Sequence, residues 1–232
     1  MMETGSGETA RTASLLKEKL LQRAPEHGKY PMDIEGLVIT RRHEANRIET
    51  CFSKPSVSVI IQGSKRTMLG SEEYCYGENQ CLVAGVDMPS SFYVTDASPE
   101  RPFLALCLDL DKYLITRLAA EVPPPCATGA CSYKGLSVAD VDPDILHAFL
   151  RLVELLEKPE QSPYWAAIVR EIHYRLFIGP RGIPAPTEHP RHPEQSDRPS
   201  HHVAAGQLQG TFAGRQAGSE GKHGHLHVPP PF

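Results

Sequence analysis

Histidines and carboxylates are the side chains with which a strand-rich enzyme would hold a catalytic metal ion. Between Gly36 and Asp109, where strand-forming residues concentrate, the only histidine is His43, and no His-x-His pair occurs. The carboxylates available as ligands there therefore lack histidine partners; they include Glu49, Glu72, Glu73 and Glu78. The sequence predicts no metal site and no cofactor in this region.

A second group of histidines lies near the C-terminus, as His201-His202 and as His223, His225 and His227. Imidazoles at such spacings can capture zinc or nickel. A functional metal site also needs rigid neighbours that orient its ligands, and this low-complexity segment offers none. We therefore expect adventitious metal binding at most.

Cysteines are the remaining candidate reactive groups. Cys126 and Cys131 lie five residues apart in a loop rich in Pro and Gly, where they could form a reversible disulfide or react with an electrophile. No Lys, Arg or His stands beside either one to lower its pKa, which favours two ordinary loop thiols. The other four lie in strand-like apolar runs and are expected as small core or pocket residues: Cys51, Cys75, Cys81 and Cys107.

Composition narrows the function further. The chain has 232 residues, a formal net charge of −4 and a pI near 6.3, which argue against a chain-wide basic surface for phosphates. It contains no long apolar run and no signal-peptide pattern, so we expect a cytoplasmic protein with reduced thiols. No hydrolytic constellation, phosphate loop or zinc-finger spacing occurs, and we predict that the protein is not an enzyme.

The elements that would position these groups are mostly strands. Seven short runs rich in Val, Ile, Tyr and Phe are separated by Gly, Pro, Asn and Asp: GLVIT, VSVIIQG, KRTML, EEYCYG, QCLVAGV, SFYVT and FLALCLDLD. Such spacing is typical of a sandwich or barrel and not of alternating β-α units. We predict a small antiparallel β-barrel.

Helical periodicity brackets this barrel. Thr12 to Ala24 predicts a short amphipathic helix, and KYLITRLAAEV predicts another after the last strand. Two further helices are predicted, one capped by Asp142 with Pro143 at its first position, and one from Ser162-Pro163 to Gly179-Pro180. Together they form a helical hairpin, and the predicted fold class is α+β.

The pattern ends near Pro180. From Arg181 to Phe232, apolar residues are scattered singly among Pro, Gly, His, Gln and Arg, so this tail is expected to be disordered. The predicted organisation is therefore a helix and flexible end in 1–30, the barrel in 31–122, a linker and helical region in 123–180, and the tail in 181–232.

Several motifs resemble the N-terminal sensor domain of AraC-type bacterial transcription regulators. They are Gln62-Gly63-Ser64-Lys65, Tyr74-x-Tyr76, the Leu82 strand, Asp87-Met88-Pro89, Ala97-Ser98-Pro99-Glu100 with Pro102, Leu104-Ala105-Leu106, Glu171 to Leu176, and Gly179 to Gly182. The resemblance covers roughly Ile34 to Gly182. It implies a cupin-like domain that binds a small-molecule effector, helices that often dimerise, and a paired helix-turn-helix module that binds DNA.

The tail offers no helix that could enter a DNA groove, which suggests a change of reading frame near Arg181. Synonymous codons allow residues 187–193 to read, one nucleotide later, as Leu-Asn-Thr-Leu-Gly-Thr, and residues 201–206 as Ile-Thr-Trp-Leu-Arg-Asp. The same offset converts residues 227–232 into Thr-Phe-His-Arg-His, which resembles the start of a recognition helix of the family. A one-nucleotide deletion or a sequencing error would explain the tail, and the chain as written should not bind DNA specifically.

Candidate pocket residues are barrel positions whose side chains could face inward: Val59, Ile61, Tyr74, Tyr76, Phe92 and Phe103. Alternate strand residues usually fill a small barrel as core, and this is the stronger interpretation of these positions. Candidate residues of a homodimer interface come from the helical hairpin: Phe149, Val153, Trp165, Val169 and Ile172.

Two other functions fit the same pattern. One is a stand-alone cupin-like protein, either a small-molecule binder or an enzyme, whose tail is natural. The other is an interaction module that pairs with full-length relatives through the helices between Asp142 and Gly179. Bound metal, catalytic turnover or mixed oligomers would distinguish them from a regulator.

Overall fold

The computed structural model describes residues 4–122 and 135–179. Its strands are β1 (Gly28–Pro31), β2 (Leu37–Arg42), β3 (Glu49–Ser53), β4 (Ser56–Gln62), β5 (Ser64–Leu69), β6 (Glu72–Gly77), β7 (Gln80–Ala84), β8 (Met88–Asp96), β9 (Phe103–Asp109) and β10 (Leu136–Asp140). Its helices are α1 (Thr4–Arg23), α2 (Lys112–Glu121), α3 (Pro143–Leu155), the 3-10 helix η1 (Pro159–Tyr164) and α4 (Trp165–Ile178). The α+β class is confirmed.

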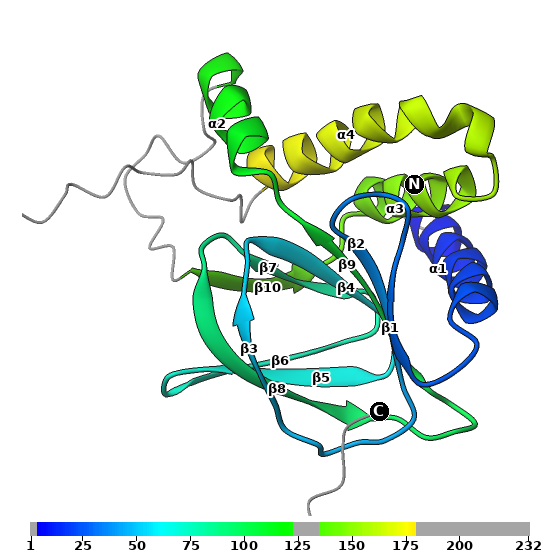
Figure 1. Ribbon diagram of the computed structural model, residues 1–232, viewed down its shortest axis with the longest axis vertical. Helices are drawn as coiled ribbons and strands as arrows, with labels where there is room; N and C mark the ends of the chain where they lie inside the picture. The colour runs from blue at the N-terminus through cyan, green and yellow to red at the C-terminus, as the bar shows by residue number, and fades with distance from the viewer. Residues whose placement is uncertain (1–3, 123–134, 180–232) are drawn as a thin grey trace, which may run out of the picture. The chain divides into compact units, whose positions relative to one another are not determined.

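The strands form two antiparallel sheets rather than one continuous barrel wall. The larger sheet has six strands in the order β1-β2-β9-β4-β7-β10, and the smaller has four in the order β3-β8-β5-β6. The chain passes from the larger sheet to the smaller at Gly63, between β4 and β5, where both neighbouring ladders shift register. The two sheets face each other across an interior (Figure 1).

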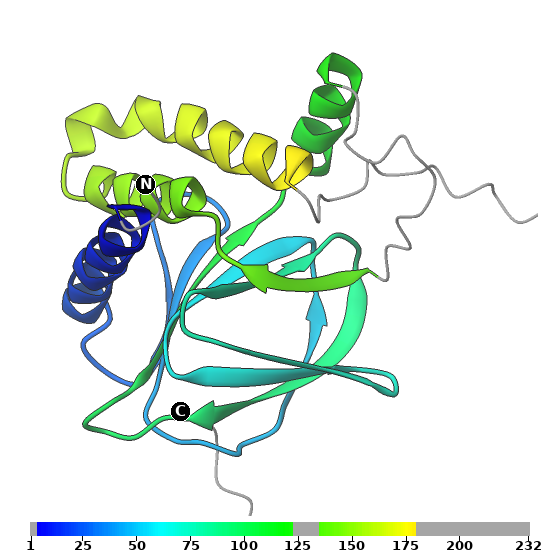
Figure 2. The same ribbon diagram turned by 180° about the vertical axis from the view of Figure 1, so that it is seen from behind.

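The larger sheet is covered on its outer face by helices. Figures 1 and 2 show α1 and α3 against this sheet, and the buried side chains of both helices belong to one apolar cluster with those of β4 and β9. Val57, Val59 and Ile61 of β4 lie in this cluster beside Leu16 and Leu20 of α1. Because side chains alternate along a strand, the intervening residues of β4 face the other sheet.

The helical hairpin forms as its sequence predicts. The Asp142 carboxylate accepts a hydrogen bond from the Asp144 backbone N–H at 2.8 Å, and Pro143 takes the first helical position of α3. The last helix begins one turn later than predicted because residues from Pro159 form η1 first. Its end at Gly179 agrees with the prediction.

Three strands lie outside the seven predicted runs. They are β1 and β3, which are both edge strands, and β10, which pairs with β7. Helix α1 also starts earlier than its apolar periodicity indicates, at Thr4. The core that positions the interior therefore draws on more of the chain than the strongly apolar runs.

Several predictions concern residues outside the described part of the chain. These are the disordered tail after Arg181, its histidines and its proposed change of frame, and the loop thiols Cys126 and Cys131. Among the helices that the structure describes, none is long and apolar enough to cross a membrane.

Candidate functional site

A cavity of about 370 Å³ lies between the inner faces of the two sheets. The six-stranded sheet contributes side chains such as Ser58, Ala105 and Cys107, and the four-stranded sheet contributes Lys65 and Phe92. Most strands supply alternate residues, such as Ser56 and Ser58 of β4, so the cavity follows from the pairing of the sheets; the edge strand β3 contributes consecutive residues. A volume in this range is typical of small-molecule sites.

The six predicted pocket residues separate into two groups. Tyr76, Phe92 and Phe103 border the cavity. Val59 and Ile61 lie on the opposite face of their sheet, packed beneath the helices, and Tyr74 packs against the inner core without bordering the cavity. The hydroxyl of Tyr74 instead donates to the Glu72 carboxylate at 2.6 Å, which raises the pKa of this tyrosine to about 12.

The cavity wall carries several hydroxyl and thiol groups, of which Ser53, Thr67 and Ser90 were not singled out from the sequence. The Ser53 and Ser90 hydroxyls are hydrogen bonded to each other at 2.7 Å. The sulfur of Cys51 lies 3.4 Å from the hydroxyl oxygen of Ser90. On the neighbouring strands, the hydroxyls of Thr67 and Tyr76 are 3.1 Å apart. Short polar side chains in strands leave space that larger residues would fill.

Lys65 places an ammonium group inside this cavity. Its Nζ lies 3.8 Å from the centre of the Phe92 ring. Burial lowers the pKa of Lys65, and the nearby Cys107, Cys51 and Glu49 side chains only partly oppose this effect. The side chain is thus held where its charged form is costly, even though part of its surface still faces the cavity.

A cluster of charges lies at one end of the cavity. The Arg42 guanidinium bonds the Glu49 carboxylate through Nε at 3.2 Å, and Lys29 Nζ is 3.8 Å from the same carboxylate. Burial would raise the pKa of Glu49, but its bond to Arg42 and these two positive charges lower it overall. Glu49 is therefore a carboxylate, and it ties β3 of one sheet to β2 of the other.

The amino-acid sequence matches the model of a known protein family over most of the described residues. Residues 33–183 match the family model described as the AraC-type transcriptional regulator N-terminus. The chain belongs to this family. The match begins before β2 and ends just after the described residues, so it includes strands β2 to β10 and the helical hairpin of the AraC-type domain, but not α1 or β1.

Solved structures with distant similarity to the AraC-type domain include ToxT from Vibrio cholerae O395 bound to (E)-4-(8-methylnaphthalen-1-yl)but-3-enoic acid, with 8% identity and a TM-score of 0.42 over 60% of this chain and 58% of that one. ToxT from V. cholerae strain SCE256 with an unsaturated fatty acid has 10% identity and a TM-score of 0.40 over 62% and 54%. The AraC-like transcriptional activator CuxR has 12% identity and a TM-score of 0.36 over 62% and 51%. The AraC-type chain thus spans little more than half the length of these proteins. No curated protein matches it.

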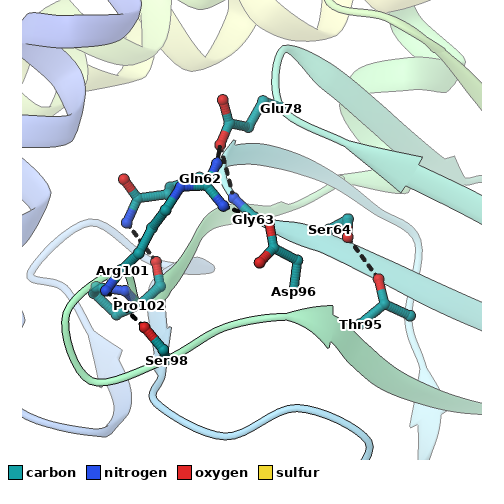
Figure 3. Close-up of polar contacts among 9 residues, drawn as sticks. All are labelled: Gln62, Gly63, Ser64, Glu78, Thr95, Asp96, Ser98, Arg101 and Pro102. Atoms are coloured by element: carbon teal, nitrogen blue, oxygen red, sulfur yellow. Dashed lines mark hydrogen bonds and ion pairs between the residues drawn. The ribbon is translucent and has the colours of Figure 1, made fainter.

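Two of the motifs that carried the AraC-type resemblance, Gln62 to Lys65 and Ala97 to Pro102, contribute to a clamp where the chain changes sheets (Figure 3). The Gln62 side chain donates to the Pro102 carbonyl at 2.6 Å, and the Gly63 N–H donates to Glu78 Oε1 at 3.1 Å. The Arg101 guanidinium bonds both Glu78 and Asp96. These residues fix the turn that leads into β5, and so they position Lys65.

Gly63 is required in this clamp for steric reasons. Its φ is +83°, and a Cβ atom built there would lie 2.4 Å from the carbonyl oxygen of Asp96. The clamp motif thus has a structural role, whereas its last residue, Lys65, enters the cavity. A register shift between Ser64 and Lys65 separates these roles along the strand.

The predicted interface residues lie mostly inside the AraC-type domain. Phe149, Val153 and Ile172 are fully buried in its own core, while Trp165 and Val169 are partly exposed on α4. Homodimer formation through α4 remains a prediction. Of the five predicted interface residues, only Trp165 and Val169 are exposed enough to contact a partner.

The described cysteines of the AraC-type domain lie in three different environments. Cys51 and Cys107 border the cavity, Cys81 is buried in the core beneath the helices, and Cys75 is exposed, all as free thiols. Within residues 4–122 and 135–179, no cluster of three or more His, Cys, Asp or Glu side chains could hold a metal ion.

Proposed function

We propose that this chain is the effector-sensing part of an AraC-type transcription regulator, and that it binds a small molecule in the cavity between its sheets. The observation that carries this proposal is the cavity itself, which lies inside a domain of a regulator family and is bordered by both sheets. A ligand there would contact β9, which leads directly into α2 and onto α4. Occupancy could therefore reach the helices that precede a DNA-binding half.

A thermal-shift screen of small metabolites would test the cavity as the binding site. We expect some compounds to raise the unfolding temperature of the wild-type protein but not that of Ser58→Leu, which fills the cavity with three more carbon atoms. Ser14→Leu, on the exposed side of α1, is the matched control and should respond like wild type. Equal responses of all three proteins would contradict the proposal.

The proposal extends to the C-terminal tail. The family match ends at residue 183, close to Arg181, where we infer a change of reading frame that removed the DNA-binding half. Sequencing the gene tests this inference. A stop codon in the shifted frame, or the lack of an amphipathic helix pair there, would exclude it.

DNA binding provides the complementary test. The chain as written should bind its own upstream DNA only weakly and with strong salt sensitivity in a gel shift, since we expect no helix for reading bases in residues 181–232. A frame-restored chain should bind the same DNA specifically. Specific, salt-resistant binding by the chain as written would contradict the proposal.

A further inference from the structure

The charges that border the cavity are unbalanced. Among the residues that the structure describes, four cationic side chains line it, together with a single carboxylate, that of Asp109. The cationic residues are Lys29, Arg42, Lys54 and Lys65. A concave site with an excess of one sign concentrates small ions of the opposite sign. The cavity as a whole therefore favours an anion.

The four cations differ in what already neutralises them. Lys29 and Arg42 share the Glu49 carboxylate. Lys54 is exposed to solvent, and Asp109 lies close enough to it to interact. Lys65 is the exception, since no carboxylate in the described part of the chain forms an ion pair with it. A bound anion would therefore stabilise the ammonium of Lys65 more than it would stabilise the other three cations.

The surroundings of Lys65 compensate its charge only in part. Contact between an ammonium and an aromatic ring is a weak attraction. Removal of an ion from water is much more costly unless a counter-ion is supplied. The Phe92 ring, 3.8 Å away, therefore leaves much of this cost unmet. An anionic group that enters the cavity would meet it.

The size and lining of the cavity restrict the rest of the ligand. A volume of about 370 Å³ equals that of roughly a dozen water molecules in the liquid. Beside the charged and hydroxyl-bearing side chains, the walls have an apolar part that includes the rings of Phe92 and Phe103 and the side chains of Ala105 and Leu136. A compact ring with a short acidic arm fits this combination of space and surface.

We propose that the ligand of this cavity is a compact aromatic carboxylate, whose carboxylate forms an ion pair with Lys65 Nζ and whose ring lies against Phe103 and Ala105. This inference rests on the proposed function, because it names the chemical class of the effector. The hydroxyls of Thr67 and Tyr76 lie on the same wall as Lys65 and are hydrogen bonded to each other at 3.1 Å, so the pair has one remaining O–H that can donate to a carboxylate oxygen.

Three probes with the same skeleton test the class of ligand by calorimetry. They are 3-phenylpropanoate, the neutral 3-phenylpropanamide and 3-phenylpropanal. The full-length wild-type protein should bind the carboxylate at least about tenfold more tightly than the amide, a difference of about 1.4 kcal/mol. Equal affinity for the two, or no saturable binding of the carboxylate, would overturn the inference.

Substitution of Lys65 by methionine removes the charge and keeps a similar length. Lys65→Met should lose about tenfold or more in affinity for the carboxylate and should bind the amide as well as wild type does, which also shows that the variant is folded. Lys158→Met, on the exposed turn after α3, is the control and should behave like wild type. Unchanged carboxylate binding by Lys65→Met would contradict the assignment.

The aldehyde probe distinguishes an ion pair from a covalent bond. A neutral lysine amine could add to the aldehyde carbon and lose water to give an imine, which cyanoborohydride reduces to a stable secondary amine. We expect no stoichiometric labelling of Lys65, because its partner is a carboxylate. Full labelling, detected by mass spectrometry, would assign the site to carbonyl compounds instead.

Failure of this inference can be told apart from failure of the proposed function. If the amide and the carboxylate bind equally and Ser58→Leu abolishes both, the cavity binds ligands but not by charge. If Ser58→Leu binds the probes as wild type does, the cavity is not the site, and both conclusions fail.

Discussion

Gly63 shows how a single residue decides whether the inner site can form. Its backbone has a positive φ, and a side chain would meet the Asp96 carbonyl. Gly63→Ala is therefore expected to destabilise the protein by about 3 kcal/mol or more, through backbone strain and steric overlap together. The change is measured as the free energy of unfolding in urea.

Gly70 is the matched control for this prediction. It also has a positive φ, of +58°, but no atom lies within 4 Å of the Cβ position. Gly70→Ala should therefore cost only the backbone strain, about 1–2 kcal/mol. Equal losses for the two variants would show that contact with Asp96 is unimportant.

His173 is a second residue whose environment has a measurable consequence. Burial lowers its pKa from the ordinary value of 6.5, against the opposing effects of the Val169 carbonyl and the Asp111 carboxylate. Its Nε2 accepts a hydrogen bond from the Asp111 N–H at 2.9 Å, and Nδ1 lies 2.8 Å from the Val169 carbonyl oxygen. The ring is therefore neutral, and it joins α4 to the start of α2.

The sign of the pH dependence follows from this lowered pKa. Near pH 6.5 the unfolded chain takes up a proton that the folded chain refuses, so acidification favours unfolding. The stability that neutral His173 contributes is complete well above pH 6.5 and is lost progressively as the pH falls from 6.5 towards 5.5. His173→Gln should reduce this loss, measured as the difference between the free energies of unfolding in urea at pH 6.5 and pH 5.5. His147→Gln, at an exposed position, should not reduce it. An unchanged loss in His173→Gln would contradict the assignment.

At the scale of elements, the sequence predicts strands better than it predicts their faces. All seven apolar runs are strands, but β4 is apolar at successive positions from Val59 to Ile61. This strand is covered by helices on one side and borders the interior on the other, so no alternation marks the inner face. Val59 and Ile61 have the parity of the outer face, and Ser56 and Ser58 that of the cavity.

The strands that the sequence did not predict are short or weakly apolar. β1 reads GKYP and β3 reads ETCFS, and each is an edge strand that needs few buried side chains. Lys65 was equally hidden, because a lysine in a strand usually faces water. Only the clamp at Gly63 and the register shift beside it turn this side chain into the cavity.

Helix α3 makes a prediction at this scale, because it presents opposite environments on its two faces. Phe149 is fully buried against the larger sheet, whereas His147 on the same helix is exposed. Phe149→Ala should lower the free energy of unfolding by about 3–5 kcal/mol. His147→Ala should change it by less than about 0.5 kcal/mol. A small effect of Phe149→Ala would mean that α3 does not pack on the sheet in solution.

At the scale of the whole molecule, the six-stranded sheet separates two tasks. Its outer face, with α1, α3 and α4, carries the larger apolar cluster, and its inner face borders the cavity. The segment Leu110-Asp111 connects them, since it follows the cavity residue Asp109 and bonds His173 of α4. Substitutions on the inner face can thus change which ligand the cavity fits, without altering the packing of the helices on the outer face.

This division also predicts how much of the chain the fold requires. Within the described residues, the buried apolar side chains extend from Leu16 to Phe177. A chain that ends at residue 182 keeps all of them. Its urea midpoint should match that of the full chain, and its free energy of unfolding should agree within about 0.5 kcal/mol. Its unfolding is followed by circular dichroism.

A chain that ends at residue 161 is the control for this truncation. It lacks α4 and so loses Ile172, His173, Leu176 and Phe177 from the core. Each large apolar side chain removed from a core costs about 2–5 kcal/mol, and the loss of three such side chains is comparable with the total stability of an ordinary domain. This shorter chain should not fold cooperatively. A lower midpoint for the chain that ends at residue 182 would instead show that residues beyond it contribute to the folded domain.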